Sequence, residues 1–349
     1  MMNKFYALKI KEIIRETPEA VSLSFEIPQD LKDKFNYKAG QYVTIKTDID
    51  GKEIRRAYSL CSSPHTHEFK VTIKEVPKGL FSGLANNKLK AGDILEVHPP
   101  EGKFIFEPGV IPQNYAAFAA GSGITPVLSI IKTVLIREPE SKFVLVYGNK
   151  SLDETIFFKE LLELQIKYPE RLFIEFIYSQ TREENAQFGR IETSTVNYVL
   201  KNKFKGTSFK TYFLCGPEPM INSVTEILKQ NGIPEERILF ELFTAKEDDE
   251  VTIATEGEVS LTIMVDDEDF ALTMDSKKTV LEVALDNDID VPYSCQGGIC
   301  SSCIARITEG TAVMRKNQIL TDSEIAEGLI LTCQAQPTSP VLKVDYDDV

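Results

Sequence analysis

Four cysteines near the end of the chain constrain its fold more than any other feature. Their spacing is Cys295-x4-Cys300-x2-Cys303, and Cys333 follows after 29 further residues. In a cytosolic chain, three thiols within nine residues indicate metal binding rather than disulfides. The pair Gly297-Gly298 allows the loop to curl closely and to direct backbone N–H groups at sulfur. We therefore predict that this loop wraps around a thiol-bound metal group.

The spacing also indicates which group the thiols hold. Zinc sites favour two C-x2-C-like knuckles, whereas one loop here carries three thiols and the fourth stands alone. A C-x4-C-x2-C run followed by a distant cysteine is the plant-type [2Fe–2S] pattern, in which each of two irons needs two thiolates. The segment Ser260–Val344 thus resembles a plant-type ferredoxin domain. A structural zinc site and free buried thiols remain the alternatives for these cysteines.

Acidic residues are concentrated in the last third of the chain. The 349 residues include 39 Lys and Arg against 53 Asp and Glu, a net charge of −14. Residues 244–349 hold 22 of the acidic and only 7 of the basic residues, so the first 243 residues are nearly neutral. This balance argues against nucleic-acid binding through a general basic surface. The acidic residues either serve only to keep this region in solution or attract a partner protein with a basic surface.

No membrane or export segment is expected. The first residues carry a charge every few positions and lack the apolar run of a signal peptide. The uncharged stretch Val110–Ile131 is long enough to suggest a membrane span, but Pro112, Gly121 and Pro126 divide it. We expect a soluble, cytoplasmic protein.

Hydrophobic periodicity predicts three domains, which makes the fold class multidomain α/β plus β. Alternating strands in residues 1–112 indicate an antiparallel β-barrel. Apolar strands that alternate with helices in residues 113–243 indicate an α/β domain with a parallel sheet. A polar, acidic linker, 244–258, leads to a β-rich domain, 259–349. The strands expected in the barrel are Phe5–Glu16, Val21–Ile27, Tyr42–Asp48, Ile54–Leu60, Phe69–Val76 and Ile94–His98.

The barrel region carries three short motifs. Arg56-Ala57-Tyr58-Ser59 lies on a strand, Lys78–Ser82 opens a short helix, and Pro100–Phe104 follows the last strand. The N–H groups at a helix start can hold a pyrophosphate. Together these motifs resemble the flavin domain of the ferredoxin–NADP reductase superfamily, with a β-grasp-like ferredoxin domain appended.

That resemblance implies roles for individual residues. Arg56 would pair with a flavin phosphate, Tyr58 would stack on the isoalloxazine, and the Ser59 hydroxyl would lie near N5, where hydride arrives. FAD is the expected flavin, with FMN as the alternative because the adenine contacts are the least recognisable. The other implied flavin contacts are Ala57, Lys74, Gly79, Leu80, Phe81 and Ser82.

A glycine-containing turn joins the first strand of the α/β region to its first helix. The turn is Gly121-Ser122-Gly123-Ile124-Thr125-Pro126. Thr125 can cap the helix and Pro126 suits its first position, so Gly121, Gly123, Thr125 and Pro126 are expected to bind a dinucleotide pyrophosphate. A tight turn without a ligand is the alternative.

A second motif, Cys215-Gly216-Pro217-Glu218-Pro219-Met220, ends another parallel strand, where open α/β sheets bind ligands. The resemblance implies that Cys215, Gly216 and Met220 lie beside the nicotinamide, although an inert buried thiol is the alternative for Cys215. Glu241 and Phe243 match the acidic and aromatic residues that the family places near the flavin, with a buried strand end as the alternative. Ser59, Cys215 and Glu241 are therefore the candidate catalytic residues.

The nicotinamide preference depends on the loop after the third parallel strand. In the family a Ser-Arg pair there binds the 2′-phosphate, but here Gln180 follows Ser179. Arg182 or Arg190 can replace the missing arginine, and no acidic residue stands where a ribose acceptor is expected. We expect NADPH, with NADH as the alternative.

The order flavin, nicotinamide, ferredoxin resembles the reductase components of multicomponent bacterial oxygenases, and most closely the subfamily that serves phenylacetyl-CoA oxygenation. It implies electron flow from NAD(P)H through FAD and a [2Fe–2S] cluster to an oxygenase near the acidic domain. The alternative acceptors are another mono- or dioxygenase and a hybrid-cluster protein. A flavin enzyme with its own small substrate and a zinc-stapled nucleotide-binding protein are the other hypotheses.

Overall fold

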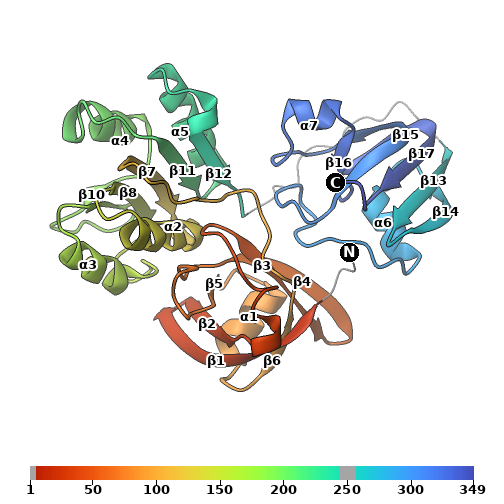
Figure 1. The fold of residues 1–349 in the computed structure, drawn as a ribbon, viewed down its shortest axis with the longest axis horizontal. Coiled ribbons are helices and arrows are strands. Elements are labelled where there is room, and N and C mark those ends of the chain that lie inside the picture. The colour runs from red at the N-terminus through yellow and green to blue at the C-terminus, as the bar shows by residue number, and fades with distance from the viewer. Residues whose placement is uncertain (1–4, 244–256) are drawn as a thin grey trace. The chain divides into compact units, whose positions relative to one another are not determined.

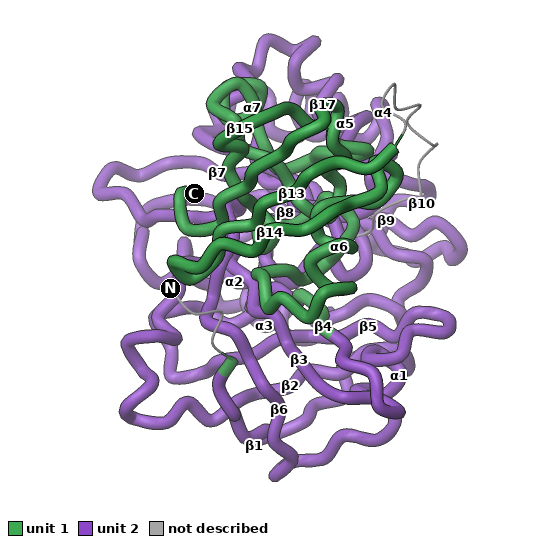
Figure 2. Tube along the Cα trace, turned by 90° about the vertical axis from the view of Figure 1, so that its right-hand side faces the viewer, with its two compact units in different colours: residues 1–5, 55–57, 244–349 green, residues 6–54, 58–243 purple. Residues whose placement is uncertain are grey.

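The computed structural model describes residues 5–243 and 257–349. Figure 2 shows that the chain forms two compact units. The larger holds residues 6–54 and 58–243, and the smaller holds most of the C-terminal third. Most of the expected linker 244–258 lies outside the described residues, and Glu258 already begins strand β13. The three borders expected between these four segments remain predictions.

The first part of the larger unit is a six-stranded antiparallel sheet with the order β4-β3-β6-β1-β2-β5. All six expected strands are present, with ends shifted by one or two residues. The alternation of apolar and polar residues explains these strands, because successive side chains of a strand point to opposite faces. In β1, Leu8 and Ile10 are fully buried, whereas Lys9 and Lys11 are exposed. Helix α1 (Leu80–Asn87) packs against β2 and β5 (Figure 1). The strand bounds are β1 Tyr6–Thr17, β2 Ala20–Glu26, β3 Tyr42–Ile49, β4 Lys52–Ser59, β5 Lys70–Lys74 and β6 Ile94–Val97.

The second part of the larger unit is a six-stranded parallel sheet with the order β10-β9-β8-β7-β11-β12. The chain starts at β7, moves outward through β8, β9 and β10, and then returns to the other side of β7 with β11. The strand order therefore reverses between β7 and β11, which is where open α/β sheets bind ligands. The strand bounds are β7 Asn114–Ala120, β8 Lys142–Asn149, β9 Leu172–Tyr178, β10 Gln187–Phe188, β11 Thr211–Cys215 and β12 Ile238–Glu241.

The helices of this part differ in detail from the sequence prediction. Helix α3 begins at Phe158, directly after Phe157, which adopts a left-handed φ of 62°. The expected cap at Thr125 is wrong, since a 3₁₀ turn precedes α2 and Gly123 occupies the cap position. The helix bounds are α2 Ile124–Arg137, α3 Phe158–Lys167, α4 Thr193–Tyr198, which continues as a π-helix over Val199–Lys203, and α5 Glu218–Gln230.

The smaller unit is a mixed five-stranded sheet with the order β14-β13-β17-β15-β16. Strand β13 runs parallel to β17, while the other pairs are antiparallel. Helix α6 begins after Thr279, because Thr279 and Glu282 form a reciprocal capping box. The bounds are β13 Glu258–Val265, β14 Glu268–Asp275, α6 Val280–Asp286, β15 Ile304–Met314, α7 Asp322–Ala326, β16 Leu329–Leu331 and β17 Ala335–Asp345.

None of the helices in the described ranges has the length and apolar character needed to cross a bilayer. The uncharged stretch near residue 120 instead forms strand β7 and most of helix α2, both of which are buried. Its lack of charge therefore reflects burial inside the α/β layers.

Candidate functional site

Three strand ends bring the candidate catalytic residues together. Ser59 ends β4, Cys215 ends β11 and Glu241 ends β12. The Ser59 hydroxyl donates a 3.0 Å hydrogen bond to Glu241 Oε2, and Cys215 pairs with Glu241 in the register of β11 and β12. All three are less than a tenth exposed. The fold therefore joins residues that lie up to 182 positions apart in the chain.

Burial determines the charge at this point. It raises the pKa of Glu241 to about 8, against the opposing effect of the Ser59 hydrogen bond. Burial, and then the neighbouring Glu241 charge, raise the pKa of the Cys215 thiol well above its ordinary value. At neutral pH the thiol is protonated and the carboxyl is mostly protonated. A buried, uncharged surface of this kind is better suited to contact a flat aromatic ring than to bind an anion.

The two predicted nucleotide loops touch where the strand order of the parallel sheet reverses. A Cβ on Gly123 would lie 2.1 Å from the Cys215 carbonyl oxygen, and one on Gly216 would lie 2.8 Å from Met220 Cε. At Gly123 only glycine permits this close approach of the two loops. Thr125 donates from Oγ1 to the Ser122 carbonyl at 3.0 Å, so its hydroxyl stabilises the turn.

The candidate flavin residues lie on β4 and at the start of α1. The Tyr58 ring is 5.5 Å from the Phe81 ring, with the planes inclined by 36°. Arg56 is exposed, and its Nη1 donates to the Arg55 carbonyl. Phe81 is buried in the core while Leu80 is half exposed, so any contact from Phe81 to a ligand at the start of α1 comes from its backbone.

The turn before α1 is shaped by glycine. A Cβ on Gly79 would lie 2.2 Å from Ser82 Oγ and 2.5 Å from a Val76 methyl group. Ser82 Oγ accepts from the Val76 N–H and donates to the Gly79 carbonyl, so its hydroxyl is used within the turn. The fit to a pyrophosphate therefore rests on the backbone N–H groups at the start of α1. Lys74, expected to contact the flavin, is 3.5 Å from Glu154 in an ion pair.

The residues expected to choose between NADPH and NADH lie after β9 and β10. Ser179 Oγ donates to the Asn149 carbonyl at 3.4 Å, which holds the loop against the end of β8. Arg182 is exposed and covers the Phe188 ring at 4.9 Å, and Arg190 is also exposed. Phe243 follows β12 and is 36% exposed, so it is available at the border of the site.

The four cysteines expected to bind the metal group lie side by side. Cys295 interacts with Cys300 and with Cys333, and Cys333 interacts with Cys303. The thiols therefore form one continuous series. Four neighbouring thiols are the number that a two-iron cluster needs, because two thiolates bind each iron. All six cysteines of the chain are free.

Backbone groups of the loop point at sulfur. The Gly297 N–H donates to Cys295 Sγ at 3.3 Å, and the Gly298 N–H hydrogen-bonds Cys333. Gly298 has φ of +69°, and a Cβ there would lie 2.8 Å from the Lys316 carbonyl oxygen. This cradle of N–H donors suits thiolates that carry the negative charge of a cluster. The thiols and the N–H donors of the loop thus fit a [2Fe–2S] group.

Two residues that support the start of α1 were not found from the sequence. Asn86, near the end of α1, donates to the Ile73 and Ser82 carbonyls, and Arg15 donates to Asn86 from two nitrogens. Arg15 and Asn86 are 71 positions apart, and neither belongs to a recognisable motif. No local signal in the sequence could have paired them.

Comparisons with known proteins assign all three parts of the chain. Residues 7–106 match the oxidoreductase FAD-binding domain, residues 118–226 match the oxidoreductase NAD-binding domain, and residues 263–338 match the 2Fe-2S iron-sulfur cluster binding domain. The fold resembles that of phthalate dioxygenase reductase, with a TM-score of 0.61 and 23% identity over 98% of each chain.

Two curated relatives align over nearly their whole length. A component of the 1,2-phenylacetyl-CoA epoxidase from Escherichia coli is 35% identical over 99% of each chain. The ferredoxin reductase component of 3-ketosteroid-9-alpha-monooxygenase from Rhodococcus rhodochrous is 34% identical, over 97% of this chain and 96% of the relative. The chain therefore belongs to the family of NAD(P)H-dependent flavin and iron–sulfur oxidoreductases that act as reductase components of oxygenases.

Proposed function

We propose that this reductase receives hydride from NADPH beside Ser59, Cys215 and Glu241 and supplies electrons singly to the oxygenase of a phenylacetyl-CoA epoxidase. The observation that carries the proposal is the meeting of these three side chains beside the reversal of strand order in the parallel sheet. The proposed acceptor rests on the likeness to the epoxidase component from Escherichia coli. Free thiols throughout the chain fit a reducing cytoplasm.

Each part of the chain has a separate task in this proposal. When bound, FAD and the [2Fe–2S] group convert the two-electron delivery of a nicotinamide into single electrons. Arg56, Tyr58 and the start of α1 bind the flavin, while Gly121–Pro126 binds the dinucleotide phosphates. Cys295, Cys300, Cys303 and Cys333 bind the cluster.

The chain's own groups at the hydride site act by orientation and by excluding water. Glu241 fixes the Ser59 hydroxyl through their 3.0 Å hydrogen bond, so the Ser59 proton points at Glu241 and the oxygen lone pairs have one direction before substrate binds. Cys215, fully buried and protonated, closes the site without adding charge. The mostly protonated Glu241 keeps a proton within reach of Ser59 Oγ.

The acceptor is proposed to dock on the acidic surface of the smaller unit. Asp266, Asp267 and Glu268 form an exposed turn between β13 and β14. The carboxylate of Asp347 accepts the N–H groups of Asp266 and Asp267, which adds a fourth acidic residue to this turn. A partner with a basic face would be steered toward it. Another oxygenase with such a face is the second candidate acceptor.

The hydride site is tested by replacing Ser59 with alanine. We expect Ser59→Ala to slow flavin reduction by NADPH about tenfold or more in anaerobic rapid mixing, because the hydroxyl that Glu241 orients is lost. Ser24→Ala, which removes another buried hydroxyl of the same sheet, is the matched control. Equal rates for both variants would contradict the site, and faster reduction by NADH than by NADPH would contradict the nucleotide preference.

A further inference from the structure

The segment that follows β4 is bonded residue by residue to one face of helix α2. Residues 61–63 meet three α2 residues spaced at i, i+3 and i+4, which lie on the same side of a helix. The bonded pairs are Ser129 Oγ to the Ser62 carbonyl at 2.6 Å, Lys132 Nζ to the Cys61 carbonyl at 3.3 Å, and Ser63 Oγ with Thr133 Oγ1 at 3.0 Å. We call these three contacts the β4–α2 tie.

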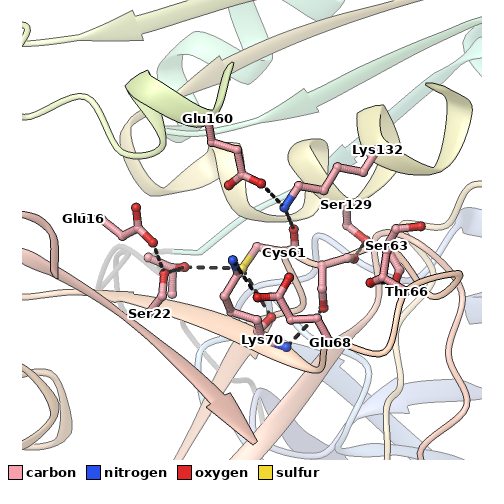
Figure 3. Close-up of polar contacts among 12 residues, drawn as sticks. Glu16, Ser22, Cys61, Ser63, Thr66, Glu68, Lys70, Ser129, Lys132 and Glu160 are labelled. Carbon is pink, nitrogen blue, oxygen red and sulfur yellow. Dashed lines mark hydrogen bonds and ion pairs between the residues drawn. The ribbon is translucent and has the colours of Figure 1, made fainter. Parts of the chain in front are cut away.

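The β4–α2 tie is dry and specific. Residues 61–63, Ser129 and Thr133 are fully buried, so each of their polar groups would be costly to leave unpaired. Lys132 Nζ also contacts Glu160 of α3 at 2.5 Å, and its side chain is only 11% exposed. Figure 3 shows Lys132 reaching from its helix to both Glu160 and Cys61. A single ammonium thus links a carbonyl of the antiparallel sheet region to a carboxylate of the α/β region.

The same segment is anchored on its other side to the antiparallel sheet. Ser62 Oγ accepts the Lys70 N–H at 3.1 Å and hydrogen-bonds Tyr37 at 2.8 Å. The Lys70 side chain, 7% exposed, is held by Glu68 at 3.0 Å (Figure 3). Residues 61–63 therefore cannot shift on α2 without disturbing β5, or shift on β5 without disturbing α2.

The tie connects the two halves of the proposed hydride site. Its first residue, Cys61, follows Ser59 by two positions, and α2 begins next to the turn Gly121–Gly123. In the proposed function the flavin lies against β4 and the dinucleotide lies against that turn. The tie is the direct set of hydrogen bonds between the segment that continues β4 and the helix that follows the turn.

We propose that Ser129, Lys132 and Thr133 are positioning residues that hold the flavin strand and the nucleotide helix in register for hydride transfer. The inference rests on the proposed function, because it takes the flavin and nucleotide locations from it. Hydride transfer is sensitive to distance, and a displacement of about 1 Å in a reacting pair can cost about 100-fold in rate. None of the three residues is expected to touch either cofactor.

The test uses the full holoenzyme and three variants. Lys132→Met removes the ammonium but keeps the aliphatic stem, and Ser129→Ala removes one hydroxyl in case the lysine variant folds poorly. Lys159→Met, an exposed position on α3 beside Glu160, is the matched control. The first measurement is the flavin-reduction rate across NADPH concentrations, which separates the limiting rate from the apparent dissociation constant. The second is amide hydrogen exchange over residues 59–63 and over α2 in each variant.

Positioning predicts a specific combination of results. In Lys132→Met and Ser129→Ala the limiting rate should fall tenfold or more, the dissociation constants for NADPH and FAD should change less than twofold, and exchange over residues 59–63 should rise. Lys159→Met should match the wild type in every measurement. An unchanged limiting rate, unchanged exchange, or a change in NADPH binding alone would each overturn the inference. Failure of the wild-type flavin to accept electrons from NADPH would instead overturn the proposed function.

Discussion

At the residue scale, Glu241 shows how burial turns an ordinary carboxyl into a titrating group near neutral pH. It is 8% exposed, and burial raises its pKa from 4.5 to about 8. Between these two values the folded state keeps a proton that the unfolded state has released. The contribution of this bound proton to the free energy of unfolding is therefore fully present below about pH 4.5 and is lost as the pH rises through about 8.

Glu241→Gln should remove this pH dependence, because the amide cannot ionise. In the wild type the free energy of unfolding should fall by a few kcal/mol between pH 5 and pH 9, at about 1.4 kcal/mol for each tenfold difference in proton affinity. In the variant the curve should be flatter over that range. Urea unfolding at several pH values measures both. Glu236→Gln, an exposed carboxyl near β12, is the control, and a wild-type-like slope in Glu241→Gln would contradict the assignment.

At the scale of elements, helix α1 depends on a residue at its far end. Asn86 is 5% exposed and joins the helix to the Ile73 carbonyl of β5 at 3.1 Å. Its side-chain oxygen accepts from Arg15 of β1 at 2.9 Å. The start of α1, which we propose binds the flavin pyrophosphate, is thus oriented by contacts two turns away.

Asn86→Ala should weaken FAD binding without removing a contact to it. Loss of these buried hydrogen bonds is expected to cost about 1–3 kcal/mol of stability. If about 1.4 kcal/mol of this loss is needed to order the start of α1 again when FAD binds, FAD affinity falls about tenfold. Titration of the apoprotein with FAD, followed by flavin fluorescence, measures the change. Asn87→Ala, at the exposed neighbouring position, should bind FAD as the wild type does, and equal affinities for both variants would contradict this role.

At the scale of the whole molecule, the chain consists of two units with separate cores. The proposed hydride site lies in the larger unit, and the cysteine loop lies in the smaller. This division places the residues proposed for two-electron transfer and those proposed for one-electron transfer on separate cores. Reduction of the flavin and reduction of the acceptor should therefore respond to different substitutions.

Cys300→Ser should abolish electron delivery to the acceptor and leave flavin reduction by NADPH intact. The serine hydroxyl is a poor replacement for a thiolate ligand, so the cluster should be lost or altered. Stopped-flow absorbance follows the flavin bands, and an oxygenase or an artificial one-electron acceptor follows delivery. Ser24→Ala, at a buried hydroxyl of the antiparallel sheet, is the control. Loss of both activities in Cys300→Ser would contradict separable units.

Charge reversal at the acidic turn should weaken docking of the acceptor. Glu268→Lys is expected to raise the apparent KM for the oxygenase several-fold at low salt and to reduce its salt dependence, because exposed charges act mainly on encounter. Steady-state turnover at two ionic strengths provides the measurement. Glu170→Lys makes the same change on an exposed loop of the larger unit and should have little effect. The same response in both variants would show that net charge alone, rather than this turn, governs docking.

Much of the architecture follows from local patterns in the chain. Alternation of apolar and polar residues located the six strands of the antiparallel sheet, and apolar runs indicated the strands of the parallel sheet. These signals are local because strand and helix periods are properties of a few consecutive residues. The Thr125 cap was wrong because a 3₁₀ turn precedes α2, so Gly123 takes the cap position and the Thr125 hydroxyl bonds the Ser122 carbonyl instead.

The chain's spacing of cysteines and its short motifs were enough to indicate the cofactors, because most residues of each expected motif lie close together in sequence. Tertiary structure decided everything that depends on residues distant in sequence. The Ser59–Glu241 hydrogen bond, the raised pKa of Glu241 and the β4–α2 tie exist only where separate strands and helices meet. Burial and alignment of polar groups are set by the packing of the whole larger unit, and no window of sequence contains that packing.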